Sequence, residues 1–137
     1  MASAGCAPFG EREGEDLIRG ARAAYATIPP YPGATEISHG EGTARANDGG
    51  GPVTGGSVVH VFRLPRGATV GAVAAFYRRR LVQHGWSLWE TLPGLPNQAA
   101  GPVLNFRRGR DGVSVNLEGG YGHRLELAVT EKREPAG

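Results

Sequence analysis

Four histidines are the side chains best suited to bind a metal or to move protons, and they are scattered along the chain. His39, His60, His84 and His123 never occur at a ligand spacing such as His-x-x-x-His, so a metal site would require the fold to bring them together. His60 stands between two valines, where a strand histidine is most simply exposed or hydrogen-bonded. Histidine spacing therefore predicts no metal site.

Nucleophilic catalysis also lacks a signature in this sequence. The chain has no Gly-x-Ser-x-Gly elbow, and no aspartate stands beside a histidine in a catalytic pattern. Glu90, Glu118 and Glu126 could approach one another on a sheet, but isolated strand carboxylates are usually solvated or paired with arginines such as Arg107 and Arg124. We therefore expect no catalytic residue, no cofactor and no enzymatic activity.

Arginines form two clusters that could hold an anion. One is the run 78–80 and the other is Arg107-Arg108-x-Arg110. Clustered arginines can bind phosphate backbones, but sheet-type RNA binders also stack bases on exposed aromatic rings, and Trp89 is the one candidate platform. A solvated helix face, or contact with anionic lipid head groups, is favoured over nucleic acid. The candidate ligand contacts are Arg107 and Trp89.

Arg80 is the one charged side chain that helical geometry places within the apolar arc of a predicted helix. An arginine there must either extend its methylenes along the apolar surface and lift its guanidinium into water, or bind a carboxylate or carbonyl groups. The first arrangement is the expected one. The second would make Arg80 a further candidate ligand contact.

Composition indicates one modest globular domain with a share of loop. Of the 137 residues, 39% are hydrophobic and 20% are charged, and 23 are glycine and 10 proline, so part of the chain should be loop or tether. The formal net charge is only +2, which does not by itself imply binding to nucleic acid. No run approaches the roughly 18 apolar residues of a transmembrane helix.

Cys6 is the only cysteine, and it follows Ser3-Ala4-Gly5. Small residues directly before a cysteine resemble the end of a bacterial lipobox, in which the cysteine is lipidated and becomes the mature N-terminus. The charged and apolar regions of a leader do not precede it in this sequence. We expect Cys6 to be the lipid anchor; the alternative is a free thiol in a flexible N-terminal segment.

The N-terminal half of the chain contains a helical stripe, two strands and a glycine-rich segment. Apolar residues at helical spacing predict a short amphipathic helix over 13–28, which Pro29-Pro30 would end. A turn then leads to a short strand over 35–38. Seven glycines and few apolar residues predict a mobile loop over 40–56, and a β-branched and aromatic run predicts a strand over 57–64.

The C-terminal half reads as one helix followed by four strands. Thr69 as N-cap and Gly85 just past the end bracket a helix with apolar residues at steps of three and four. Alternating segments predict strands over 86–92, 103–107, 113–117 and 125–130, with a turn at Asp111-Gly112 between the second and the third. The residues expected in one core between helix and sheet are Phe76, Leu81, Trp86, Leu104, Phe106, Val115 and Leu127.

The element order β-β-α-β-β-β-β predicts an α+β two-layer sandwich, in which one main helix packs on a mostly antiparallel sheet, with a short N-terminal helix in addition. The expected divisions are a flexible tether or lipobox remnant over 1–12, the helical segment 13–30, the sandwich domain 31–131 and a tail over 132–137.

Four sequence features together resemble small bacterial envelope lipoproteins whose activities are mostly unassigned. They are Tyr31-Pro32-Gly33-Ala34, Phe76-Tyr77-Arg78 with Leu81, Gly85-Trp86, and the Leu-Asn-Phe-Arg-Arg-Gly segment 104–109. The likeness covers roughly residues 28–130. It implies a strand-helix-meander domain behind a lipobox and tether, and it implies no chemistry.

The leading functional hypothesis is a non-enzymatic envelope lipoprotein, extracytoplasmic and lipid-anchored, that acts as a binding or assembly module. Its contact surface would be the open sheet face or the edge of the strand beside the glycine-rich segment, and its partner an envelope protein or an anionic lipid surface. The alternative is a cytoplasmic α+β domain that binds a small anionic ligand or nucleic acid through its arginines. An enzyme with a site assembled only by the fold is the third.

Overall fold

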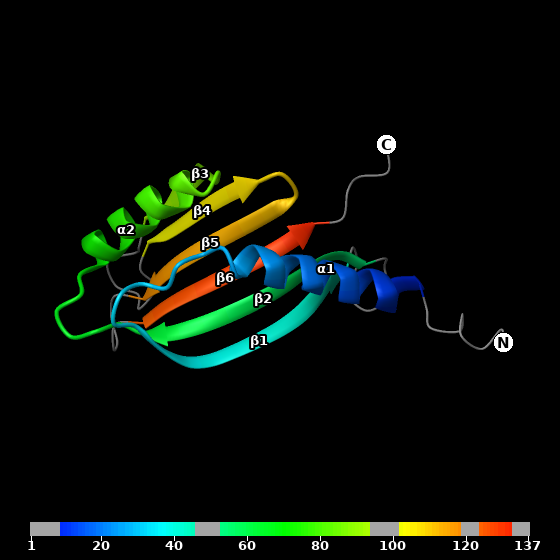
Figure 1. Ribbon diagram of the computed structural model, residues 1–137, viewed down its shortest axis with the longest axis horizontal. Coiled ribbons are helices and arrows are strands. Elements are labelled where there is room, and N and C mark those ends of the chain that lie inside the picture. Colours follow the sequence, from blue (N-terminus) through cyan, green and yellow to red (C-terminus); the bar gives the residue numbers. More distant parts are fainter. Residues whose placement is uncertain (1–8, 46–52, 94–101, 119–123, 133–137) are drawn as a thin grey trace.

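The computed structural model describes residues 9–45, 53–93, 102–118 and 124–132, and it confirms the α+β sandwich. Two helices and six strands follow one another in the predicted order (Figure 1). Their bounds are α1 Phe9–Tyr25, β1 Thr35–Arg45, β2 Val53–Arg63, α2 Val70–Gln83, β3 Ser87–Leu92, β4 Val103–Arg108, β5 Asp111–Glu118 and β6 Arg124–Lys132.

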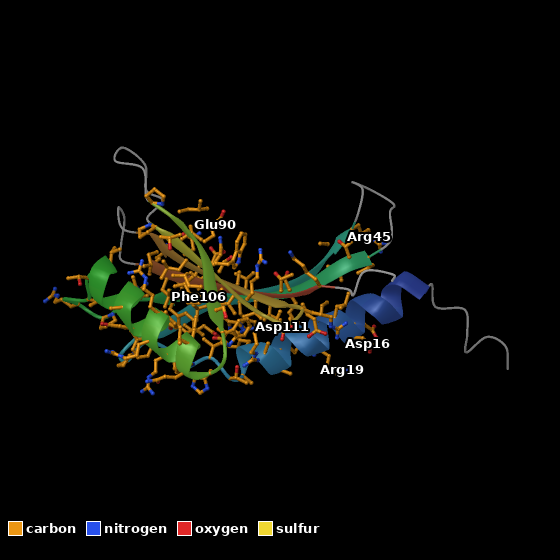
Figure 2. The ribbon with its side chains drawn as sticks, turned by 90° about the horizontal axis from the view of Figure 1, so that it is seen from above. Asp16, Arg19, Arg45, Glu90, Phe106 and Asp111 are labelled. Atoms are coloured by element: carbon orange, nitrogen blue, oxygen red, sulfur yellow. The ribbon has the colours of Figure 1, made fainter. Side chains whose placement is uncertain are left out.

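The six strands form one sheet in the order β1-β2-β6-β5-β4-β3. Every neighbouring pair is antiparallel, so β3 to β6 make the predicted meander and the β1–β2 hairpin joins it through β6. Figure 2 shows both helices on one side of the sheet and Glu90 on the other. In the described part of the chain, the second face is therefore covered by no helix; we call it the outer face.

The core lies between the helices and the inner face of β4, β5 and β6, as the alternation of these strands predicts. Phe106, Val115, Leu125 and Leu127 are all at 0% exposure, while the residues between them along the strands are only partly buried. From α2 the buried side chains are Val73, Ala74, Tyr77 and Leu81.

Phe76 corrects one expectation about this core. Six of the seven residues expected there are buried, but Phe76 is only partly buried and packs against the edge of the cluster. Its ring makes edge contacts with Tyr31 and Tyr77, at centroid distances of 5.3 and 5.0 Å. Tyr77 and Leu81 point at the sheet instead, and Phe76 lies on the shoulder of the helix.

The ends of α2 follow the sequence signals. The side chain of Thr69 accepts a hydrogen bond from the backbone N–H of Ala72 at 3.1 Å, which caps the helix. Gly85 has φ 87°, a value that favours glycine, and beyond it the N–H of Trp86 donates to the carbonyl of Leu81 at 2.9 Å. This turn places Trp86 in the core, at 2% exposure.

The predicted mobile loop over 40–56 is wrong. β1 extends to Arg45 and β2 begins at Val53, and the two strands are paired through this segment with one irregularity between Ala44 and Arg45; only residues 46–52 lie outside the described ones. β1 is an exposed edge strand, so it needs backbone pairing rather than apolar side chains. Gly56 is needed because α1 crosses β2 closely: a Cβ there would lie 2.5 Å from the backbone nitrogen of Ile18.

Two boundary predictions also change. Residues 9–12 are helical, since α1 begins at Phe9, and the remainder of the predicted tether lies outside the described residues. The β4–β5 turn is made by Gly109, with φ 60°, and Arg110. The expected turn at Asp111-Gly112 is instead the start of β5.

Candidate functional site

The outer face carries an open hollow of about 390 Å³ where β3, β4, β5 and β6 lie side by side. Polar and charged side chains share its wall with one large aromatic ring. Its lining residues are Trp89, Asn105, Phe106, Arg107, Gly109, Arg110, Asp111, Gly112, Val113, Ser114, Thr130 and Lys132.

Trp89 and Arg107, two of the predicted ligand contacts, meet at this hollow. The guanidinium carbon of Arg107 lies 4.1 Å from the centre of the Trp89 ring system, a cation-π geometry. The contact depends on an irregularity in β3, where the pairing with β4 shifts between Leu88 and Glu90, so that Trp89 and Glu90 both turn to the outer face. Trp89 remains 50% exposed.

A chain of hydrogen bonds crosses three strands beside this pair. Asn105 donates through Nδ2 to Oε1 of Glu90 at 2.8 Å, and Ser114 donates through Oγ to Oδ1 of Asn105 at 2.6 Å. These bonds fix the amide of Asn105 and hold β3, β4 and β5 in one register. They also engage the Ser114 hydroxyl, so the group lies in a structural network rather than beside a base.

Cationic groups outnumber acidic ones around the hollow. Arg107, Arg110 and Lys132 line it together with one carboxylate, Asp111. Arg110 also pairs with Glu131, Nη2 to Oε1 at 3.1 Å. Burial, followed by a hydrogen bond and repulsion from Asp111, raises the pKa of the Glu131 carboxyl. The arrangement suits an anionic group that contacts Arg107 and rests beside an aromatic ring.

Arg80 lies elsewhere and does not contribute to the hollow. Its side chain is exposed on α2, in the helix layer, and its guanidinium carbon stands 5.7 Å from the centre of the Phe76 ring. Its charge therefore lies in water, as in the expected arrangement. The structure brings together Trp89 and Arg107 but not Arg80.

A second polar cluster joins α1 to the edge of the sheet. His60 of β2 donates through Nδ1 to Glu36 of β1, and Nδ1 of His39 lies 3.4 Å from the other oxygen of the same carboxylate. The ring of Tyr25, from α1, stacks on His60 with the centroids 3.8 Å apart. Nearby, Arg22 of α1 donates to Glu41 of β1, Nη2 to Oε1 at 2.6 Å. We call these six residues the α1–β1 cluster.

Electrostatics in the α1–β1 cluster follow from these contacts. The hydrogen bond from His60 lowers the pKa of Glu36, and the hydrogen bond from Arg22 lowers that of Glu41. Burial, assisted by the charge of Glu36, raises the pKa of Tyr25 to about 12. The stack and the hydrogen bonds together tie α1 to the edge strand. The histidine spacing gave no signal for this cluster, because it depends on the β1–β2 register.

The other candidate residues from the sequence do not come together at one site. Glu90 is bound to Asn105 rather than to another acid, and the Glu118 side chain, His123 and Cys6 lie outside the described ones. The carbonyl of His84 accepts from Arg108 at 3.0 Å, and the Arg108 guanidinium carbon lies 4.4 Å from the Trp86 ring centre. These contacts hold the C-terminal end of α2 against β4.

No group of three or more His, Cys, Asp or Glu side chains among the described residues could hold a metal ion. No helix in this part of the chain is long and apolar enough to cross a membrane.

Comparison of the chain with protein-family models, with curated proteins and with solved structures gives no significant match.

Proposed function

We propose that the chain is a non-enzymatic binding or assembly module of the bacterial cell envelope, anchored by a lipid at Cys6, whose outer face takes an acidic segment of a partner protein. The observation that carries the proposal is the Trp89–Arg107 pair at a hollow on an uncovered sheet face. Antiparallel sheets often leave one face to solvent, but a half-exposed tryptophan with a stacked guanidinium is the kind of anchor found at protein interfaces.

The charges around the hollow support an acidic partner. Arg107 stacks on Trp89 and forms no ion pair with a carboxylate among the described residues, so its donors can serve a bound carboxylate in two-point geometry. Asn105 and Ser114, fixed in their own network, add a polar rim. The arginines of α2 lie on the other layer, so a membrane surface that used them would not engage the hollow.

The binding part of the proposal is tested with a defined probe. A glutamate-rich decapeptide added to the full chain should change the emission of Trp89, and Trp89→Phe should remove that change because the other tryptophan, Trp86, is buried. Arg107→Gln should weaken binding at least about 10-fold, the equivalent of one charge-assisted contact. Arg63→Gln, at an exposed position of β2, is the matched control and should change affinity less than about 2-fold.

The outcomes separate the partner classes. If phosphatidylglycerol vesicles change Trp89 emission and the peptide does not, the partner is a lipid surface and the proposed protein partner is wrong. If neither does, or if Arg63→Gln weakens binding as much as Arg107→Gln, the hollow is not the contact surface.

The anchor is tested separately. The gene expressed with its natural upstream sequence in a bacterium that processes lipoproteins should incorporate labelled palmitate, and Cys6→Ser should abolish the label. A native chain that takes up no label would exclude the anchor and favour the cytoplasmic alternative, without affecting the argument about the outer face.

A further inference from the structure

The β1 edge of the sheet offers a second contact surface, distinct from the hollow. β1 is the terminal strand (Figure 1), and no described strand pairs with its outer side. It is 11 residues long and exposed along almost its whole length. An edge strand leaves alternate N–H and C=O groups unpaired, which makes it a template for another strand.

The charged residues that usually protect such an edge are turned back onto their own subunit here. Glu36 is bound by His60, and Glu41 by Arg22. On the opposite face of the strand, the residues around its centre are small, Gly40 and Gly42 among them. A Cβ at either glycine would meet no atom within 4 Å. Neither face of the central part of β1 therefore obstructs a neighbouring strand.

We propose that β1 pairs with β1 of a second copy of this chain, antiparallel and centred on Gly40, so that two sheets become one. A two-fold axis perpendicular to the sheet keeps both helix layers on the same side. Directly opposed residues of two antiparallel strands share a face, so this axis must lie between one residue and the same residue of the partner. The candidates in the central part of β1 are residues 39 to 42.

Charge complementarity selects among these four registers. With the axis at Gly40, His39 faces the partner's Glu41 and Glu41 faces the partner's His39, so an imidazole N–H donor meets a carboxylate acceptor at two places. An axis at His39 would set His39 against the partner's His39, and an axis at Glu41 would set Glu41 against the partner's Glu41. An axis at Gly42 would set His39 against the partner's Arg45, again without attraction.

Helix positions leave room for this pairing. α1 packs chiefly on β2 and β6 and touches β1 much less. Each α1, lying over β2 and β6, would be about two strand spacings from the proposed axis. Since neighbouring strands lie about 4.8 Å apart, the two α1 helices would be roughly 19 Å apart. A helix with its side chains is about 10–12 Å across. The helices would therefore flank the joined strands without colliding, and Glu41 would lie between Arg22 of its own chain and the partner's His39.

Gly40 provides the sharpest test, because on the proposed axis it faces its own copy. The full 137-residue chain, kept reduced, should show a concentration-dependent monomer–dimer equilibrium in sedimentation between about 1 µM and 1 mM, the range of weak edge contacts. Gly40→Lys and Gly40→Glu should each weaken association at least about 10-fold, because like charges oppose each other at the axis. A 1:1 mixture of the two variants should regain it.

Controls and contradictory outcomes are defined by the same geometry. Gly71→Lys, on α2 at a position equally open around its Cβ, should leave association unchanged. Far-UV circular dichroism and the melting temperature verify that each variant folds. Ser38→Lys combined with Gly42→Lys, which face each other across the axis and so set like charges in opposition, replaces a Gly40 variant that does not fold. A chain that stays monomeric at 1 mM, Gly40 variants that associate normally, or a mixture that stays monomeric would each overturn the proposal.

Discussion

The ring of His60 lies flat on the ring of Tyr25, with the centroids 3.8 Å apart and the planes inclined by 9°. This contact joins a strand residue to the last residue of α1. Because His60 also donates to Glu36, one imidazole links α1, β2 and the edge strand β1. The N-terminal helix is thus tied to the sheet by an aromatic stack in addition to its apolar stripe.

His60→Ala should lower the free energy of unfolding by about 1–3 kcal/mol, since it removes a stacking partner and leaves Glu36 without its donor. His39→Ala is the matched control: its side chain is 66% exposed, and we expect a change of less than about 0.5 kcal/mol. Urea unfolding at pH 7 measures both. Equal effects of the two substitutions would show that the stack contributes nothing.

The lowered pKa of Glu36 predicts a loss of stability in acid. The folded state favours the ionised carboxylate because His60 donates to it, so this contribution is present above the unfolded pKa, about 4.3, and is lost as the pH falls through the folded value. Glu36→Gln should therefore flatten the dependence of unfolding free energy on pH between about 4.5 and 3. His60→Phe keeps a ring on Tyr25 and removes the donor, so it should flatten the same slope. An unchanged slope in both variants would contradict the assignment.

The sequence predicts the α2-to-β6 half of the fold well, for identifiable reasons. Alternation along β4 to β6 is a short-range signal that a half-buried strand cannot avoid, and Thr69 and Gly85 act through the backbone of their own turns. The extension of β1 to Arg45 and of β2 back to Val53 escaped prediction, because Gly56 serves a close approach to α1 and the edge strand buries almost nothing. Composition alone cannot tell such a strand from a loop.

The candidate sites also differ in how far the sequence predicts them. Trp89 and Arg107 are recognisable singly, as an aromatic ring and a cation on strands, but their contact depends on the irregularity between Leu88 and Glu90, which leaves no mark in the sequence. The α1–β1 cluster combines residues from α1, β1 and β2, so only the register His39↔His60 reveals it. Long-range pairing is decided by the whole sheet rather than by local spacing.

Phe106 and Phe76 should differ clearly when truncated. Phe106 is at 0% exposure in the centre of the core, so Phe106→Ala should cost about 3–5 kcal/mol. Phe76 lies on the shoulder of α2 and keeps solvent contact, so Phe76→Ala should cost about 1–2 kcal/mol, less than a full cavity. Chemical unfolding of both variants compares them directly. A Phe76 cost equal to that of Phe106 would mean that the shoulder position is part of the core.

Glu131→Gln should stabilise the protein at neutral pH. Burial and the neighbouring Asp111 raise the pKa of the Glu131 carboxyl in the folded state, so ionising it costs stability as the pH rises from the unfolded value, about 4.3, through the folded one. A neutral amide avoids that cost. We expect a gain of up to about 1 kcal/mol at pH 7 that disappears below about pH 4. A loss at pH 7 would show instead that the ion pair with Arg110 dominates.

Gly56 and Gly71 should respond oppositely to the same substitution. At Gly56 a Cβ would lie 2.5 Å from the backbone nitrogen of Ile18 and 2.6 Å from the carbonyl carbon of Leu17. These are backbone atoms of α1 and cannot move aside as a side chain does, so Gly56→Ala must push the helix off β2 and should cost at least about 2 kcal/mol, in the upper range of overpacking. At Gly71, inside α2, no atom lies within 4 Å of the added Cβ, and alanine is the better helix former, so Gly71→Ala should add about 0.5–1 kcal/mol. Thermal unfolding of the two variants, with the native chain as reference, gives both signs in one experiment. A neutral Gly56→Ala would mean that α1 does not hold its place on the β1–β2 hairpin, and the close crossing inferred for Gly56 would be wrong.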